Sequence, residues 1–381
     1  MAAVKTRFAF LDNIRSLVIF LVVAMHSAVT YSGFGSWYYI EGSPEKLSIF
    51  GMVFFGFLQS FIQAWTMGIL FFISAFLAVK SLARHGTKKF IGERIFRLGV
   101  PLLIYQFLIS PLMSFLVPGN NPIENHPEIS LLKQYAYYVL SLEWLGSTGP
   151  LWFVQVLLFF CIVYSMVKKI FPGGVKVQNV TKANVTIIVL LTGVIAFLIR
   201  LIFPVGTSFM NLQFSYFSSY IVMLILGIIA GENNLLDNIA NSKNIFWLKL
   251  ALIIGIPVWA LIMIFGGVLN GEMKISGGFY WQSFAYSFWE SFTAIAFSLG
   301  LISFFRNNVN IENKFTSLIR NNAFGIYVFH APILTAVSLG LRHWMVNPVP
   351  KFFIVMLLAF IICLLFSALI RKIKPVGILL K

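Results

Sequence analysis

The chain has 381 residues, of which 59% are hydrophobic and only 10% are charged. Soluble domains carry about 25% charged residues, so this composition excludes a soluble globular protein and indicates a polytopic membrane protein. The formal net charge is +16, but the basic residues lie in short segments between apolar runs. That pattern is typical of membrane topology and argues against nucleic acid as a partner. The two cysteines, Cys161 and Cys363, lie inside apolar runs, and we expect them to pack in the core.

Apolar runs of the ~20 residues that a bilayer requires recur along the whole sequence. We therefore predict an all-α membrane helix bundle, a single integral-membrane domain over 1–381 with about ten transmembrane helices. The predicted spans are 11–31, 60–80, 98–117, 150–168, 185–203, 214–231, 246–266, 284–305, 323–341 and 352–371. Segment 49–59 is apolar too, and either extends the second span or lies at the outer interface. Trp37, Tyr38 and Tyr39 fall at a predicted interface, where anchoring in the aromatic belt explains them.

The distribution of positive charge predicts the orientation. With the N-terminus in the cytoplasm, most of the 28 Lys and Arg residues fall in cytoplasmic segments. The outer segments then hold only Lys46, Lys133, Arg200, Lys274, Arg342 and Lys351. This bias predicts a multi-pass protein of the cell membrane with both termini in the cytoplasm.

The first span carries two ionisable residues, Arg15 and His26. At ~100° per residue they point to the same helix face, roughly 16 Å apart along the axis. Groups of this kind inside a span are costly and usually face a protein interior with a function. The alternative is an arginine that reaches the membrane surface and a histidine bonded to a neighbouring helix. On spacing alone the two interpretations are equally good.

The segment from Lys80 to Pro101 is the most basic part of the chain. Arg94 and Arg97 are three residues apart and share a helix face. Such a pair at the cytoplasmic mouth of a bundle suits a phosphorylated ligand, because arginine binds phosphate with two hydrogen bonds. Attraction to anionic lipid headgroups is the alternative, and without further observations it is the better one.

Three more ionisable residues lie within the predicted spans or at their ends: Arg200, Glu290 and His330. Intramembrane carboxylates and histidines are functional candidates by default. A Glu290–Arg200 pair and a histidine bonded across helices are the structural alternatives. Motifs for zinc, for a phosphate-binding loop or for a serine nucleophile are absent from the sequence, so we predict no metal.

Several short motifs in this order resemble the acyltransferase 3 family, and most of all its branch that modifies glucans and other polysaccharides. The similar segments are Leu11 to Arg15 followed by His26, Phe71 to Leu77, Phe90 to Pro101, Gly149 to Phe153, Arg200 to Pro204, and Tyr327 to Pro332. They cover nearly the full length. One departure is Ala75, where the family has a glycine.

The resemblance implies transfer of an acyl group from cytosolic acyl-CoA to a hydroxyl of an extracytoplasmic carbohydrate. Acetyl is the first expectation, and succinyl is the alternative. The resemblance implies His26 as general base, supported by Glu143 or Glu290. It further implies acyl-CoA binding by Arg15, Arg94, Arg97 and His330, and acceptor binding by Trp152 and Arg200. Two rival classes stay open: a transporter or flippase for a sugar-type substrate, and a membrane sensor whose polar groups are structural.

Overall fold

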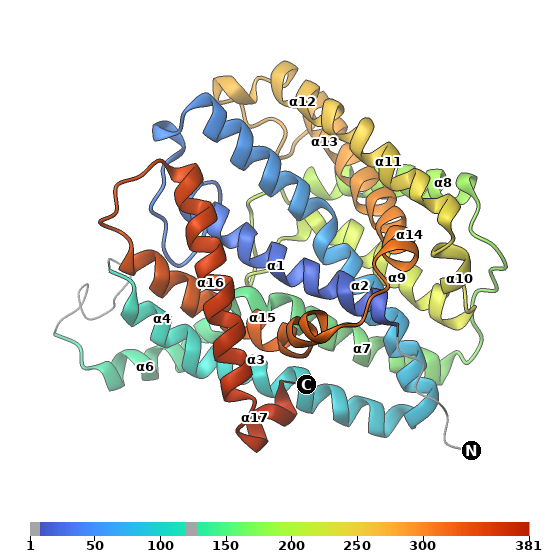
Figure 1. Ribbon diagram of the computed structural model, residues 1–381, viewed down its shortest axis with the longest axis horizontal. Coiled ribbons are helices and arrows are strands. Elements are labelled where there is room, and N and C mark those ends of the chain that lie inside the picture. Colours follow the sequence, from blue (N-terminus) through green and yellow to red (C-terminus); the bar gives the residue numbers. More distant parts are fainter. Residues whose placement is uncertain (1–7, 119–127, 381) are drawn as a thin grey trace.

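The computed structural model describes residues 8–118 and 128–380 of the chain. Within these residues the regular structure is helical, apart from one bridge between Phe209 and Leu212, and the all-α prediction is confirmed (Figure 1). Lys5, Arg7 and Lys381, on which the predicted orientation partly rests, lie outside the described residues.

The α-helices of the described residues follow one another without sheet between them. In chain order they are α1 (Ala9–Ser32), α2 (Ile49–Arg94), α3 (Val100–Ile104), α4 (Ser110–Leu116), α6 (Leu131–Leu140), α7 (Trp152–Ile170), α8 (Lys182–Arg200), α9 (Phe217–Glu232), α10 (Leu236–Ile239), α11 (Ile245–Ile253), α12 (Gly255–Phe265), α13 (Trp281–Phe292), α14 (Ser298–Asn308), α15 (Lys314–Gly340), α16 (Pro348–Ile370) and α17 (Lys374–Leu379).

Nine helical segments of the described chain are long and apolar enough to cross a membrane, which confirms a polytopic membrane protein. One of them, Ile49–Leu116, has 68 residues. At ~1.5 Å per residue it is roughly three times as long as the ~30 Å hydrocarbon core of a bilayer. It bends at Gly86, whose φ of 71° is a left-handed value that favours glycine. Figure 1 shows the chain changing direction there, from blue into cyan, so this one segment contains both the second and the third predicted span. Segment 49–59 is the beginning of α2.

Helix α1 lies at the centre of the bundle, in contact with α2, α15 and α16. Its buried side chains, such as Ile14, Val18 and Val23, are apolar and lie on more than one face. A helix that is apolar all round needs neighbours on every side. The helix ends where Gly33 adopts φ 71° and its N–H bonds the carbonyl of Val29. The chain then turns back over the end of α1 in a loop to Leu47, which we call the 33–47 loop.

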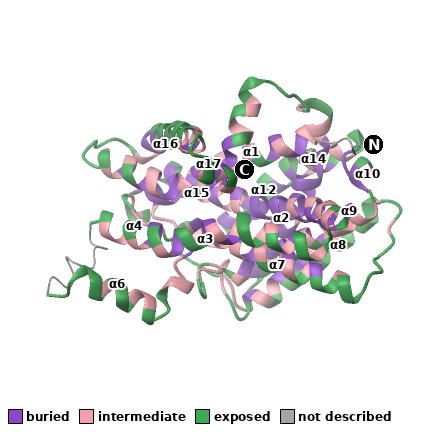
Figure 2. Cartoon of the chain, turned by 90° about the horizontal axis from the view of Figure 1, so that it is seen from below, coloured by how far each residue is buried: buried purple, intermediate pink, exposed green. Residues whose placement is uncertain are grey.

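Exposed side chains collect on the outer helices, and Figure 2 shows this most clearly for α16 and α6. On α16 many of the exposed side chains are apolar, among them Leu357, Ile361 and Leu365. An exposed apolar surface of this kind on a membrane protein is the surface that lipid chains cover.

Candidate active site

Two histidines from distant parts of the sequence meet inside the bundle. His26 belongs to α1 and His330 to α15, two helices that pack against each other. The centroids of the two imidazole rings are 5.2 Å apart. His330 is fully buried, whereas His26 keeps part of its surface accessible. The histidine pair therefore combines one fixed imidazole with one that a ligand can reach.

The hydrogen bonding of His330 defines which of its nitrogens can accept a proton. Its Nδ1 lies 2.7 Å from the backbone carbonyl oxygen of Tyr327. A carbonyl only accepts hydrogen bonds, so Nδ1 carries the proton and the lone pair of a neutral ring is on Nε2. That Nε2 is buried and has no hydrogen-bond partner among the described residues. Buried polar atoms are normally paired, so this acceptor is available to a polar group of a ligand.

Trp37, which the sequence assigned to the aromatic belt, stacks on His26. The ring centroids are 3.7 Å apart and the ring planes differ by 14°. Trp37 also lies nearly parallel to His330, at 6.0 Å between centroids. Its indole nitrogen Nε1 is buried and unpaired. The belt interpretation missed this role because nothing in the local sequence pattern says that the 33–47 loop folds back over α1.

Several contacts hold the 33–47 loop in place. The backbone N–H groups of Glu41 and Gly42 both donate to the carbonyl of Thr30, at 2.9 and 3.0 Å. The Glu41 carboxylate accepts a hydrogen bond of 2.5 Å from the Nζ of Lys351, which is buried at the start of α16. A Cβ atom at Gly42 would lie 1.9 Å from the carbonyl oxygen of Tyr31, so only glycine fits. These contacts fix the loop that presents Trp37.

The Gly149–Phe153 motif approaches the same region from another side. The hydroxyl of Tyr327 donates to the carbonyl of Pro150. A Cβ atom at Gly149 would lie 2.3 Å from the Tyr38 hydroxyl, so the motif needs glycine for this close approach. Tyr38 and Tyr105 share a hydrogen bond of 2.9 Å between their hydroxyls. Burial raises the pKa of the Tyr38 phenol above its ordinary value, which keeps it a neutral hydrogen-bonding group.

Arg200 and Glu290 form a buried ion pair between α8 and α13, as the structural alternative anticipated. Both side chains are almost inaccessible, at 0% and 2% exposure. Arg200 also donates to the Ser287 hydroxyl at 3.2 Å. Yet Arg200 Nε and Glu290 Oε1 remain unpaired among the described residues. Among the residues that the structure describes, no hydrogen bond or ion pair joins Arg200 or Glu290 to His26.

Trp152, predicted to bind the acceptor, and Glu143, predicted to support His26, have different settings. Trp152 stacks on Tyr220, with 5.5 Å between ring centroids, and Tyr220 accepts a hydrogen bond of 2.9 Å from Gln63. Glu143 is exposed on a short turn before the Gly149–Phe153 motif. In the part of the chain that the structure describes, no hydrogen bond or ion pair joins its carboxylate to His26.

The three arginines predicted to bind acyl-CoA gather in one region. Arg15 is exposed at the first turns of α1 and pairs with Asp12 at 3.4 Å. Arg97 lies within electrostatic range of both Arg94 and Arg15. It belongs to a π-helical turn, Ile95–Gly99, a rare element that is frequent at functional sites. Like charges repel, so three clustered guanidinium groups favour an anionic ligand between them. Residues 8–118 and 128–380 contain no group of three His, Cys, Asp or Glu side chains that could hold a metal ion.

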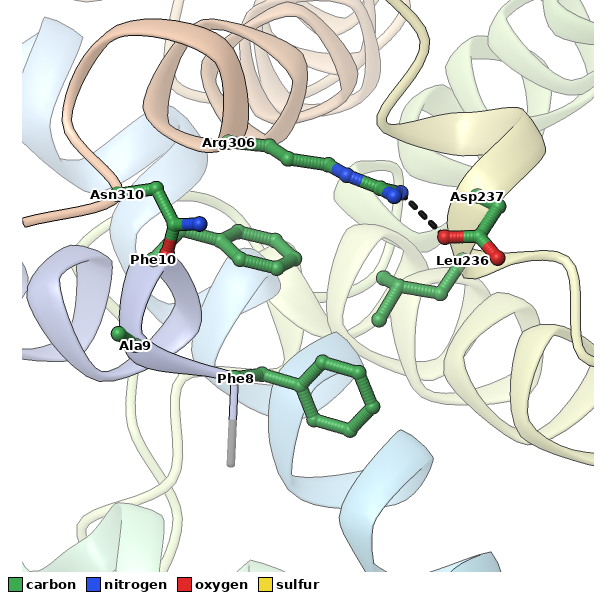
Figure 3. A pocket seen from close by; sticks show the side chains of 7 residues that line it. All are labelled: Phe8, Ala9, Phe10, Leu236, Asp237, Arg306 and Asn310. Atoms are coloured by element: carbon green, nitrogen blue, oxygen red, sulfur yellow. Dashed lines mark ion pairs between the residues drawn. The ribbon is translucent and has the colours of Figure 1, made fainter. Parts of the chain in front are cut away.

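A separate cavity of about 190 Å³ lies beside the start of α1. Figure 3 shows that Arg306 and Asp237, which both line this cavity, point toward each other. The two side chains form an ion pair with a distance of 2.5 Å. Next to it, Asn13 of the first motif donates to the carbonyls of Val309 and Ile311, at 2.8 and 3.0 Å. Asn13 thus has a structural role, which is to tie α1 to the segment after α14. Neither His26 nor His330 lines this cavity.

Comparison with known proteins supports the motif-based resemblance. Residues 8–368 match the acyltransferase 3 family, described as an acyltransferase domain. The relatives include the glucans biosynthesis protein C of Salmonella gallinarum, 26% identical over 47% of this chain and 44% of that protein. The proteins of the same name from Salmonella paratyphi B and Salmonella heidelberg are 29% identical over 39% of this chain and 35% of theirs. The matches therefore span less than half the length of these relatives. The comparison with solved structures found no significant match.

The family match covers almost the whole chain and includes both histidines, the arginine cluster and the Gly149–Phe153 motif. The fold of apolar helices fits a protein embedded in a bilayer. The chain therefore belongs to the acyltransferase 3 family and is a polytopic membrane protein.

Proposed function

We propose that this acyltransferase moves an acyl group from cytosolic acyl-CoA to a hydroxyl of an extracytoplasmic carbohydrate. The observation that carries the proposal is the placement of two sites along α1, with Arg15 in the arginine cluster and His26 in the histidine pair. The acyl group is acetyl in the first place, with succinyl as the second candidate. The carbohydrate acceptor is supported by the glucans biosynthesis proteins among the relatives.

The topology of the proposal follows the positive-inside rule. Both termini and the arginine cluster are on the cytoplasmic side, where CoA is available, and the protein is a multi-pass protein of the cell membrane. Arg15, Arg94 and Arg97 bind the CoA phosphates, because guanidinium groups make short, charge-assisted hydrogen bonds to phosphate. The pantetheine arm reaches along α1 toward His26, so CoA itself does not cross the membrane.

The chemistry needs a base at the acceptor. A sugar hydroxyl is a poor nucleophile until its proton is taken up as it attacks, a contribution of roughly 10²–10⁴-fold. In our proposal the neutral imidazole of His26 removes this proton while the hydroxyl oxygen bonds the thioester carbonyl carbon. The carbon–sulfur bond then breaks, and the proton passes from His26 to the departing thiolate. In the same proposal Trp152 and Arg200 bind the acceptor away from the reacting hydroxyl, and the exposed Glu143 holds the sugar.

The test is acceptor-dependent release of the CoA thiol by the purified protein in detergent or vesicles. Acetyl-CoA and succinyl-CoA are each supplied with a panel of glycan acceptors, and wild type is compared with His26→Ala. Release that needs an acceptor and disappears in the variant supports the proposal. Wild-type protein that releases no thiol but carries a sugar across vesicle membranes would point to the transporter class.

A further inference from the structure

Two buried polar atoms belong to rings that pack close to His26, and together they favour one kind of ligand group. The Trp37 Nε1–H is a hydrogen-bond donor, and the His330 Nε2 is an acceptor. Both atoms are buried and lack partners among the described residues. Their rings belong to one stack with His26, at 3.7 Å from Trp37 to His26 and 5.2 Å from His26 to His330.

The identity of these two atoms excludes some ligands. A phosphate or carboxylate offers only acceptors when ionised, so it leaves the His330 Nε2 unsatisfied. An ammonium offers only donors and leaves the Trp37 N–H unsatisfied. A hydroxyl both donates and accepts, so one hydroxyl can satisfy the two atoms together. The hydrogen bonding of His330 therefore disfavours a phosphate of acyl-CoA as its ligand.

We propose that Trp37 and His330 bind a second hydroxyl of the acceptor, next to the hydroxyl that reacts at His26. The acceptor is then a sugar with two neighbouring hydroxyls, one presented to His26 and one held by the Trp37–His330 pair. This inference rests on the proposed function, because it takes His26 as the place where the reacting hydroxyl arrives. It assigns acceptor specificity to two residues, one of them in the 33–47 loop.

The surrounding contacts make this position rigid. His330 is held by its Nδ1 bond to the Tyr327 carbonyl, and Tyr327 in turn donates to the carbonyl of Pro150. Trp37 is held by the 33–47 loop, and the ion pair between Glu41 and the buried Lys351 ties this loop to α16. A donor and an acceptor that cannot move to find other partners discriminate strongly against a ligand that lacks the matching hydroxyl.

Two variants remove one polar atom each and keep the packing. His330→Asn retains an N–H near the position of Nδ1 for the Tyr327 carbonyl, but it removes the Nε2 acceptor. Trp37→Phe retains a flat ring on His26, but it removes the N–H donor. The matched control is Trp344→Phe, which changes an exposed tryptophan in the loop between α15 and α16. Size-exclusion profiles show whether each variant is folded.

The experiment compares methyl glucoside with its set of monodeoxy analogues as acceptors. For wild type we expect that one analogue, lacking the neighbour of the acylated hydroxyl, loses roughly 10- to 100-fold in kcat/KM. In His330→Asn and Trp37→Phe, the kcat/KM for methyl glucoside should fall by a similar factor, mainly through a higher KM for the acceptor. In these variants the kcat/KM for the same analogue should be only slightly lower than that for methyl glucoside. The KM for acyl-CoA should stay unchanged.

A binding measurement separates this inference from the proposed reaction. Methyl glucoside is titrated without acyl-CoA, and the change in tryptophan fluorescence of wild type is compared with that of Trp37→Phe and Trp344→Phe. A signal lost only in Trp37→Phe supports the hydroxyl site even if the wild type transfers no acyl group. Wild-type transfer in which all variants discriminate equally against the deoxy analogues would overturn the inference. Binding of methyl glucoside to Trp37→Phe with the affinity of wild type, whichever tryptophan reports it, would overturn it as well.

Discussion

His26 and His330 face each other across α1 and α15 at 5.2 Å between ring centroids, although they lie near opposite ends of the sequence. The carbonyl of Tyr327 fixes the ring of His330, and Trp37 covers one face of His26. This cluster, and not a carboxylate, surrounds the proposed base. Four predictions follow from the contacts around it and around the charged groups.

The first prediction concerns the base. His26→Ala should reduce acyl transfer by roughly 10²–10⁴-fold, because no other group takes the hydroxyl proton as it attacks. Membrane insertion should not change, since it depends on the hydropathy of the span, and alanine is less polar than histidine. CoA-thiol release is the measurement, and His343→Ala, which removes a histidine from an exposed loop, is the control. Near-normal transfer by His26→Ala would exclude His26 as the base.

The second prediction concerns the arginine cluster. Arg94→Ala and Arg97→Ala should each weaken acyl-CoA binding by roughly 10-fold or more, because a hydrogen bond to a charged group contributes about 1.5–3 kcal/mol. The effect should shrink at high salt, which screens exposed charges. Binding of acetyl-CoA is measured directly, with Lys89→Ala as a control on the same basic segment. Unchanged affinity in both variants would assign the pair to lipid binding or topology.

The third prediction concerns the buried ion pair. Glu290→Gln should lower the free energy of unfolding by roughly 3–5 kcal/mol, because it leaves the buried charge of Arg200 unpaired. The double variant Arg200→Met/Glu290→Met should regain most of that stability, because apolar groups of similar size replace both charges. Thermal unfolding in detergent measures this effect. A single variant as stable as wild type would mean that the pair is not formed.

The same double variant tests the proposed role of Arg200 in acceptor binding. If the pair serves stability alone, a stable double variant should keep the acceptor KM of wild type. A raised acceptor KM in a stable protein would support a direct role, which the unpaired Arg200 Nε and Glu290 Oε1 make chemically reasonable.

The fourth prediction concerns Gly42. Its substitution by alanine would place a Cβ atom 1.9 Å from the carbonyl oxygen of Tyr31, so the 33–47 loop must move. The movement should take Trp37 away from His26 and reduce transfer at least 10-fold, with a change in tryptophan fluorescence. Gly173→Ala is the control, because a Cβ atom there meets nothing within 4 Å. Full activity in Gly42→Ala would show that the loop position does not matter for catalysis.

Much of this molecule could be predicted from the sequence. Span length, hydropathy and the scarcity of charge determine an all-α membrane bundle, because a backbone in lipid must satisfy its own hydrogen bonds. The motifs around Arg15, His26, Arg94, Arg97 and His330 were sufficient to identify the family. The 68-residue segment contains two of the predicted spans, and its length exceeds what one crossing requires.

The composition of the site was decided by tertiary structure alone. Trp37 is an ordinary interfacial aromatic in the sequence, and only the folding of the 33–47 loop over α1 places it on His26. Lys351 counts as an outer-loop charge in the sequence, yet it is buried against Glu41. The physical reason is that periodicity and charge bias carry information only about one helix and its ends. Packing between segments far apart in the chain decides which side chains of α1, α15 and the 33–47 loop come together.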